Sequence, residues 1–331
     1  MTYPLRDDIY SDDVQLEPTR AGYGRGLRAA GESNEAIVGL CADLTESTQM
    51  HLFREAFPGR FIQVGIAEQN LITVASGLAR AGKIPFTSSY AAFSPGRSWE
   101  QIKTTVCLNE QPVKIIGSHA GIYTGPDGAT HQMLEDIALM RVLPEMVVVV
   151  PGDSVEAEKA TRAIAENGKP SYLRLAREKT AIFSTDESPF EIGVAYVLRE
   201  GHDVSLVGTG TMTHKLLLVA RELEQQGVSA EVVHVPTIKP LDKNTILASV
   251  RKTGRVVTAE EAQIVGGLGG AVAELLGEEL PTPLKRIGVD NRFGESGAPN
   301  DIFKALGLDV PSMTVTVREF VDRTPKYHQG F

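Results

Sequence analysis

The chain has 331 residues, which exceeds what one small core needs and suits two domains of about 150 residues each. Hydrophobic residues make up 42% and charged residues 23%, as in an ordinary soluble globular protein. The net charge of −9 argues against binding to nucleic acid or to an anionic membrane, since both need a basic face, but a few arginines can still hold a small anion.

The cysteines and the N-terminus indicate the cellular compartment. Cys41 and Cys107 lie far apart and lack the C-x-x-C spacing of a zinc or redox site. The polar, acidic N-terminus has no apolar signal segment, and no run reaches the roughly 18 apolar residues of a membrane helix. We therefore expect a cytoplasmic protein with neither a disulfide framework nor a membrane span.

Strand-like and helix-like patterns alternate through the first half of the chain. Short apolar runs bounded by turn residues predict buried strands, and apolar residues at helical spacing predict helices between them. The alternation indicates a parallel sheet covered by helices. The predicted strands are residues 36–42, 60–65, 84–89, 112–118 and 146–151, and the predicted helices are residues 47–56, 67–82, 97–109, 134–143 and 154–166.

A polar, proline-containing stretch at residues 177–193 interrupts this pattern and predicts a linker. A second α/β set follows, so we expect one domain at residues 1–190, with an acidic N-terminal arm, and another at 191–331. The glycine-rich residues 266–270 lack a phosphate-binding pattern, which favours close helix packing. Further strands are expected at "DVSLVGTG", "SAEVVHV", "RVVTAE" and "LKRIGV", and helices at residues 214–226, 242–252 and 264–277.

Glu68 lies in "QVGIAEQN", between an apolar strand-like run and an apolar helix-like run. A carboxylate is costly to bury there without a partner. One interpretation is an ordinary glutamate at a helix N-terminus, stabilised by the helix dipole. The other is functional, because ligands of α/β domains bind where strands pass into helices.

The segment "GSHAGIYTGPDGATHQ" at residues 117–132 follows an apolar strand and contains four glycines, two histidines and an aspartate. Its glycines and proline exclude a helix, so it is predicted to be a loop, either a plain surface turn or a functional loop. No compact ligand spacing supports a metal site, although His119, Asp127 and His131 are possible ligand types.

Arg20, Arg177 and Ser47 could form an anion site if they converge, since arginine offers a planar fork of donors. Each has an ordinary alternative: a solvated or salt-bridged surface arginine, or a serine that caps a helix. Spacing along the chain does not decide between these alternatives.

In their order and spacing, six segments resemble the C-terminal half of transketolase. The resemblance covers nearly the whole chain, from about Arg20 onward, and implies a split-transketolase subunit. The implied fold is α/β with two doubly wound domains, a thiamine-diphosphate pyrimidine-binding domain followed by a transketolase C-terminal domain. The segments are "CADLTES", "QVGIAEQN", "PFTSSYAAFSPGR", "SHAGIYTGPDGATHQ", "LRLAR" and "NRFGESG".

The resemblance implies a cofactor role for four positions. The glutamate matching Glu68 bonds a ring nitrogen of the aminopyrimidine in thiamine diphosphate, which helps the cofactor lose its thiazolium proton. An apolar pocket would keep such a carboxyl protonated. Phe93 and Tyr90 match aromatic residues around the pyrimidine, and Asp43 matches an aspartate near the cofactor. A third family aromatic falls on Gly96, which is a departure from the family.

The resemblance also implies a sugar-phosphate site. Arg20, Ser47, His119 and Arg177 match groups that hold the phosphate, while Asp127 matches the residue that contacts the sugar 2-hydroxyl. His131 matches a histidine between sugar and cofactor, and with Glu68 and His119 it is an expected catalytic residue. No metal ligand is expected on this chain.

One expected part of the enzyme is missing. Family members bind the diphosphate and a divalent cation such as Mg²⁺ through a domain carrying G-D-G, and this sequence has no G-D-G. The chain also begins near the start of the family's pyrimidine-binding domain. We therefore expect a separate N-terminal-half subunit and an α2β2 heterotetramer, because closed two-fold symmetry is common.

The resulting prediction is transfer of a two-carbon ketol unit between phosphorylated ketose and aldose sugars, as in the pentose phosphate pathway. Three alternatives stay open. Deoxyxylulose-phosphate synthase keeps the glutamate and the "DGxTHQ" run but has an Asp-Arg pair where this chain has Ser118 and His119. The β subunit of 2-oxoacid dehydrogenases has this domain order but would not be expected to have the phosphate arginines, and a non-catalytic scaffold would need none of these side chains.

Overall fold

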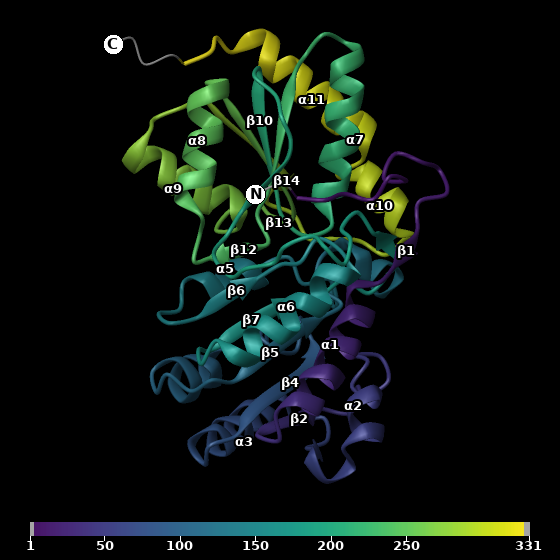
Figure 1. The fold of residues 1–331 in the computed structure, drawn as a ribbon, viewed down its shortest axis with the longest axis vertical. Helices are drawn as coiled ribbons and strands as arrows, with labels where there is room; N and C mark the ends of the chain where they lie inside the picture. The colour runs from purple at the N-terminus through teal and green to yellow at the C-terminus, as the bar shows by residue number, and fades with distance from the viewer. Residues whose placement is uncertain (1–2, 328–331) are drawn as a thin grey trace.

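Two parallel sheets, each covered by helices, organise the chain (Figure 1). The computed structural model describes residues 3–327. The larger sheet has the strand order β12-β6-β7-β5-β4-β2-β3, and every neighbouring pair is parallel except β12 with β6. Its strands are β2 (Ile37–Cys41), β3 (Phe61–Gln63), β4 (Ile84–Tyr90), β5 (Lys114–Ser118), β6 (Val147–Val149), β7 (Ser171–Arg174) and β12 (Thr237–Lys239).

The smaller sheet has the order β14-β13-β10-β11-β9 and is parallel except for the edge strand β9. These two sheets confirm the predicted α/β fold. The second set of predicted strands is present at the expected positions. The strands are β9 (Tyr196–Arg199), β10 (Val204–Gly208), β11 (Ala230–His234), β13 (Val256–Gln263) and β14 (Leu284–Val289).

The helices also follow the predicted order, with two local differences. The helix expected at 47–56 begins only at His51, after a run of turns. The helix expected at 97–109 is one α-turn that continues as a π-helix. The helices are α1 (Thr19–Ser33), α2 (His51–Ala56), α3 (Glu68–Arg80), α4 (Trp99–Gln101), η2 (Ile102–Cys107), α5 (Asp136–Arg141), α6 (Ser154–Glu166), α7 (Met212–Gln225), α8 (Lys243–Thr253), α9 (Leu268–Glu279), α10 (Pro299–Ala305) and α11 (Val310–Arg323), with the short turns η1 (Pro58–Arg60) and η3 (Ile122–Asp127).

The N-terminal arm and the predicted linker run beside each other. Strand β1 (Leu16–Glu17) pairs with β8 (Thr180–Ala181), which lies inside the linker. The Arg6 N–H donates to the Phe183 carbonyl at 3.0 Å, and His214 of α7 bonds the Ile9 carbonyl at 2.8 Å. The arm therefore reaches from the linker to the second half of the chain. Strands as short as β1 and β8, with two residues each, cannot show a period in the sequence.

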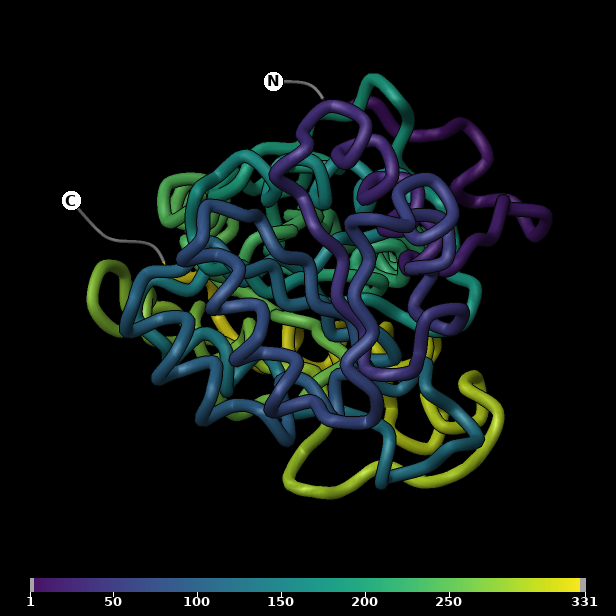
Figure 2. The backbone as a smooth tube through the Cα atoms, turned by 90° about the horizontal axis from the view of Figure 1, so that it is seen from below, coloured from purple at the N-terminus to yellow at the C-terminus, as the bar shows by residue number. Residues whose placement is uncertain are grey.

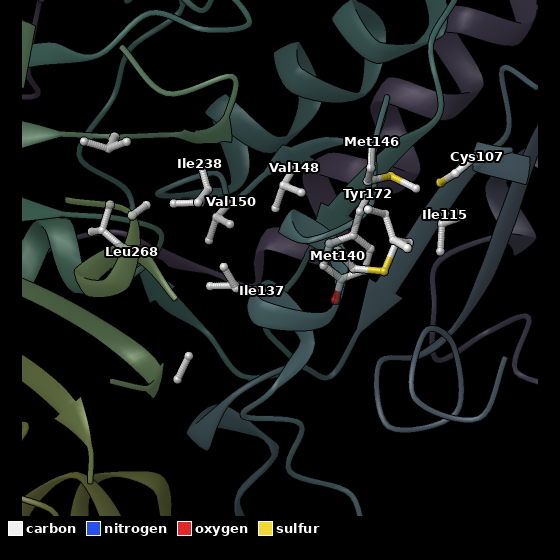
Figure 3. Packing of buried hydrophobic residues seen from close by; sticks show 14 of the residues in the cluster. Cys107, Ile115, Ile137, Met140, Met146, Val148, Val150, Tyr172, Ile238 and Leu268 are labelled. Carbon is white, nitrogen blue, oxygen red and sulfur yellow. The ribbon is translucent and has the colours of Figure 1, made fainter. Parts of the chain in front are cut away.

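One hydrophobic cluster extends across both halves of the chain (Figure 3). Cys107 and Ile115 lie on the right of this view, Met140 and Tyr172 near its centre, and Ile238 and Leu268 on the left. Strand β12 adds to this continuity, because it comes from the second half but pairs with β6 of the larger sheet. Within residues 3–327, no helix is both long and apolar enough to cross a membrane.

Glu260 explains the glycine-rich segment at residues 266–270. Its carboxylate is buried and accepts the backbone N–H groups of Leu268 and Gly269, each at 2.8 Å. A Cβ at Gly267 would lie 1.9 Å from a Glu260 carboxylate oxygen. The start of α9 is therefore occupied by a carboxylate of the chain itself. This contact agrees with the expected close packing, and two of the N–H groups that could hold a phosphate are already bonded to Glu260.

We expect Glu260→Gln to lower the free energy of unfolding by about 1–3 kcal/mol, because each carboxylate oxygen accepts one helix N–H and the amide NH2 would leave one of these N–H groups without an acceptor. Urea unfolding followed by circular dichroism measures the change. The matched control is Glu278→Gln on the exposed side of the same helix. Equal effects of the two substitutions would contradict the role given to Glu260.

Candidate active site

The candidate side chains lie at the carboxyl ends of neighbouring strands of the larger sheet. His119 follows β5, Tyr90 ends β4, Asp43 follows β2, and Glu68 begins α3 just after β3. Arg177 lies three residues beyond the end of β7. Parallel strands that are adjacent in a sheet present these ends at one edge, and ligands of α/β proteins bind there.

The Glu68 carboxylate is only 3% exposed and pairs with Arg97 at 2.8 Å. The Arg97 guanidinium also lies 4.8 Å from the centre of the Phe93 ring. Burial of the charge is therefore offset by an ion pair and a stacked ring, and Glu68 is not simply a helix-end glutamate facing solvent. Arg97 was not predicted from the sequence. The only available signal was a cation directly after the aromatic segment.

An aromatic row leads away from Glu68. Tyr90 and Phe93 are stacked with centroids 5.9 Å apart, and Tyr90 stacks on His119 at 3.7 Å. His131 meets the Phe93 ring edge-on at 5.4 Å. The structure thus places His119 beside Tyr90 and His131 beside Phe93.

Gly96 departs from the family for a steric reason. A Cβ built at this position would lie 2.3 Å from the Ala92 carbonyl oxygen, well inside van der Waals contact. The turn that carries Phe93 is also closed by a 3.0 Å bond from the Gly96 N–H to the Ala91 carbonyl. An aromatic side chain does not fit this backbone, so Phe93 and Tyr90 supply the ring surface.

His119 is buried and has a positive φ of 57°. Its Nδ1 lies 2.9 Å from the Ser118 hydroxyl. Burial, followed by the charges of Arg20 and Arg177, lowers the pKa of His119 to about 3. The imidazole is therefore neutral near pH 7 and can exchange hydrogen bonds without adding a third positive charge.

Arg20, Arg177 and Ser47 converge around His119, as the anion-site hypothesis requires. Arg20 Nη1 donates to the Ser47 carbonyl at 2.6 Å, and the Arg20 Nε is buried without a partner among the described residues. Burial, followed by the charge of Arg177, lowers the pKa of Arg20. Ser47 does not cap a helix, because Met50 occupies the cap position of α2. Two arginines that repel each other in a partly buried site favour binding of an anion.

The loop that follows β5 completes this side of the site. Arg177 Nη1 donates to the Thr124 carbonyl at 3.0 Å and lies 3.6 Å from an Asp127 carboxylate oxygen. Thr124 donates its hydroxyl to the His119 carbonyl at 2.6 Å. His131 bonds the Thr130 hydroxyl through Nδ1 at 2.9 Å. Asp127 and His131 therefore belong to the same edge as the two arginines.

Asp43 follows β2, whose neighbours in the sheet are β4 and β3. It is exposed, has a φ of 60°, and donates its backbone N–H to the Gln63 side chain at 2.8 Å. In the described part of the chain, no three histidine, cysteine, aspartate or glutamate side chains are grouped so that they could hold a metal ion.

The "NRFGESG" segment lies against the loop after β5 (Figure 2). The Gln132 amide donates to the Glu295 carbonyl at 3.0 Å and to the Gly125 carbonyl at 3.2 Å. A Cβ at Gly128 would lie 2.3 Å from the Ser296 hydroxyl. The segment therefore packs the second half of the chain against the loop that carries Asp127.

Fold and site together define an α/β protein with a buried carboxylate, an aromatic row and two neighbouring arginines at one edge of the larger sheet. Residues 17–181 match the family model for the transketolase pyrimidine-binding domain, and residues 193–313 match that for the transketolase C-terminal domain. The chain belongs to the transketolase family, which confirms the resemblance predicted from its motifs.

Three relatives illustrate the similarity. The "putative transketolase C-terminal section" of Methanocaldococcus jannaschii is 44% identical, over 91% of this chain and 95% of that protein. The "6-deoxy-6-sulfo-D-fructose transketolase subunit" of a Clostridium species is 42% identical, over 94% and 97% of the two chains. A solved structure titled "split gene transketolase, inactive beta4 tetramer" has 44% identity and a TM-score of 0.86, covering 92% of this chain and 98% of that one.

We expect the His119 imidazole to stay neutral down to about pH 3, where its lowered pKa lies. Because this pKa is below the ordinary value of 6.5, the stability that His119 contributes is present above pH 6.5 and is lost as the pH falls toward 3. NMR titration of ¹³C-histidine-labelled protein measures the pKa, with free histidine as the reference. A midpoint near 6.5 would contradict burial of this ring.

We expect Arg97→Met to lower the free energy of unfolding by about 1 kcal/mol, since it leaves the buried Glu68 charge unpaired while Arg97 itself is half exposed. Glu68→Gln in the same chain should restore most of the loss. A double-mutant cycle by urea unfolding measures the coupling. Arg54→Met removes the exposed pair with Glu46 and serves as the control. Purely additive effects of the Arg97 and Glu68 substitutions would argue against the ion pair.

Proposed function

We propose that this chain is the pyrimidine-side subunit of a split transketolase that transfers a two-carbon ketol unit between phosphorylated ketose and aldose sugars. The observation that supports the proposal is that one edge of the larger sheet bears two chemically different groups of side chains. A buried acid beside stacked aromatic rings lies at one end, and two converging arginines lie at the other. The first end suits a flat nitrogen heterocycle, and the second suits a sugar phosphate.

Thiamine diphosphate fits the acid end. A planar, nitrogen-rich cation, the Arg97 guanidinium, already contacts both Glu68 and Phe93, so this surface accepts flat groups with N–H donors. Glu68, Phe93 and Tyr90 would hold the aminopyrimidine, with Asp43 just beyond the end of β2. When bound, the cofactor supplies the carbon nucleophile for the ketose carbonyl. The role of this chain is to offer the buried Glu68 carboxyl to a ring nitrogen, where the two groups would share a proton, and to exclude water from that contact.

The anion end would bind the sugar phosphate. Arg20 and Arg177 supply charge-assisted donors, and Ser47 and the neutral His119 add uncharged hydrogen bonds. Asp127 accepts from a sugar hydroxyl, and His131, between the loop and Phe93, moves a proton at the sugar oxygen near the cofactor. The arginines would suit any terminal oxyanion. One relative is named for a sulfonated fructose. The contacts around Ser47 and His119 would therefore determine which anion this chain prefers.

The diphosphate and a divalent cation such as Mg²⁺ are assigned to a separate N-terminal-half subunit. The sequence has no G-D-G motif, and the described residues include no cluster of metal ligands. The related structure titled as an inactive β4 tetramer of a split-gene transketolase supports this division of labour. We propose an α2β2 assembly in the cytoplasm, with the domain boundary of this chain near residue 190.

Reconstitution with the N-terminal-half subunit tests the proposal. We expect ketol transfer from xylulose 5-phosphate to ribose 5-phosphate when both subunits, thiamine diphosphate and Mg²⁺ are present, and no transfer by either subunit alone. A parallel assay with pyruvate and glyceraldehyde 3-phosphate tests the synthase alternative. Activity of this chain alone would refute the split enzyme, and a folded but inactive pair would favour the scaffold.

We expect Glu68→Gln in the reconstituted pair to lower kcat by at least about 100-fold, since a positioned acid contributes roughly 10²–10⁴-fold to a proton transfer. Steady-state kinetics with xylulose 5-phosphate measures the loss. The exposed Glu55→Gln on α2 is the matched control and should leave kcat unchanged. Normal turnover by Glu68→Gln would remove Glu68 from the mechanism.

A further inference from the structure

The loop at residues 121–132 is closed at its base. Ala120 and Met133 form a bridge, and the Gly121 N–H donates to the Met133 carbonyl at 2.9 Å. The next backbone group along, the Leu134 carbonyl, accepts the Gln263 N–H at 2.9 Å. The base of the loop is thus fixed both to itself and to β13 of the smaller sheet.

Arg174, the last residue of β7, lies beneath this base. Its Nε pairs with Asp136 at 2.8 Å, and its Nη1 pairs with Glu261 at 3.3 Å. Its Nη2 donates to the Glu261 carbonyl at 3.1 Å and approaches the Met133 carbonyl at 3.5 Å. The three side chains are at most 4% exposed. One guanidinium therefore links β7, α5, β13 and the base of the loop.

Gly121 presses directly on this group. A Cβ there would lie 2.8 Å from Arg174 Nη2 and 2.8 Å from the Glu261 carboxyl carbon, and the residue has a φ of 73°. The loop backbone at Gly121 therefore lies in direct contact with both the guanidinium and the carboxylate. His119 precedes this contact, and Asp127 and His131 follow it.

A contribution to stability does not explain why Arg174, Asp136 and Glu261 are buried together. Two carboxylates share one guanidinium, and one oxygen of Asp136 and one of Glu261 are buried without a partner among the described residues. Burial raises the pKa of Glu261 to about 7, against the effect of Arg174. A buried ion pair is often no more stabilising than apolar residues of the same shape. The distinctive effect of this ion cluster is therefore the geometry that it imposes on the base of the loop.

We propose that Arg174 is a positioning residue for the sugar-phosphate site: by fixing the base of the loop at Gly121 and Met133, it sets where Asp127 and His131 stand relative to Arg177. Arg177 lies three residues after Arg174 in the chain. Arg174 therefore anchors both the segment that carries Arg177 and the loop that carries Asp127 and His131. The expected effect on substrate binding rests on the proposed function, whereas the expected effect on the order of the loop does not.

Two variants test this role. Arg174→Lys keeps the charge but loses the planar fork of donors. The triple variant Arg174→Met, Asp136→Asn, Glu261→Gln removes the three charges together, so that none of them is left buried without a partner. The control is Arg141→Met, which breaks another pair between the two halves of the chain, with Glu274 of α9, away from the loop base.

Hydrogen exchange of the isolated chain, read by mass spectrometry, reports on the loop without any activity. We expect amides in residues 121–132 to exchange at least about 10-fold faster in both Arg174 variants, with exchange at α3 unchanged. The Arg141→Met control should not accelerate them. Unchanged exchange in folded Arg174 variants, or an equal effect of Arg141→Met, would overturn the proposal even if no enzyme activity is ever reconstituted.

In the reconstituted enzyme, we expect the same variants to lower kcat/KM for xylulose 5-phosphate on the order of 10²-fold, mainly through KM, because small misplacements of binding groups are costly. Binding of thiamine diphosphate, followed by titration calorimetry, should not change, since Glu68 and Phe93 lie on other elements. A loss of cofactor binding equal to the loss of substrate binding would show a general folding defect and refute the specific role.

Discussion

The parallel register of β7, β5, β4, β2 and β3 is the constraint on which the site depends. Side chains from five segments, spread over more than half of the first domain, meet only because each follows the carboxyl end of a strand in the same sheet. The backbone hydrogen bonds of the sheet fix these ends relative to one another, whereas the loops alone would not. A slip in one strand would separate the acid end from the anion end.

Electrostatics then divides this edge into two parts. Near β3, a buried carboxylate is balanced by a half-exposed guanidinium that stacks on Phe93. Near β5 and β7, two arginines surround a histidine that burial keeps neutral. The first part bears an acid that can exchange its cationic partner for another flat group. The second carries positive charge in a partly buried setting, and an anion would reduce its repulsion.

The second half of the chain acts on this site through packing. It shares a hydrophobic cluster with the first half, adds β12 to the larger sheet, and holds the loop after β5 between the "NRFGESG" segment and Glu261. The loop that bears Asp127 and His131 is therefore shaped by residues more than a hundred positions away in the sequence.

Motif and spacing were sufficient for the family, the alternation of strands and helices, and the candidate residues Glu68, His119 and Arg177. They could not supply Arg97, Arg174 or Glu261, which carry no local pattern and acquire their roles only from neighbours on other strands. The short strands β1, β8 and β12 were also missed, because two or three residues show no period.

The sequence by itself therefore determined the two α/β sets and the types of side chain at the strand ends, since periodicity and turn residues are local properties. Only the tertiary structure decided that Arg20 and Arg177 converge, that Glu68 is paired with Arg97, and that Gly96 excludes an aromatic side chain. Each of these depends on distances between segments far apart in the chain, and those distances are set by sheet register and burial.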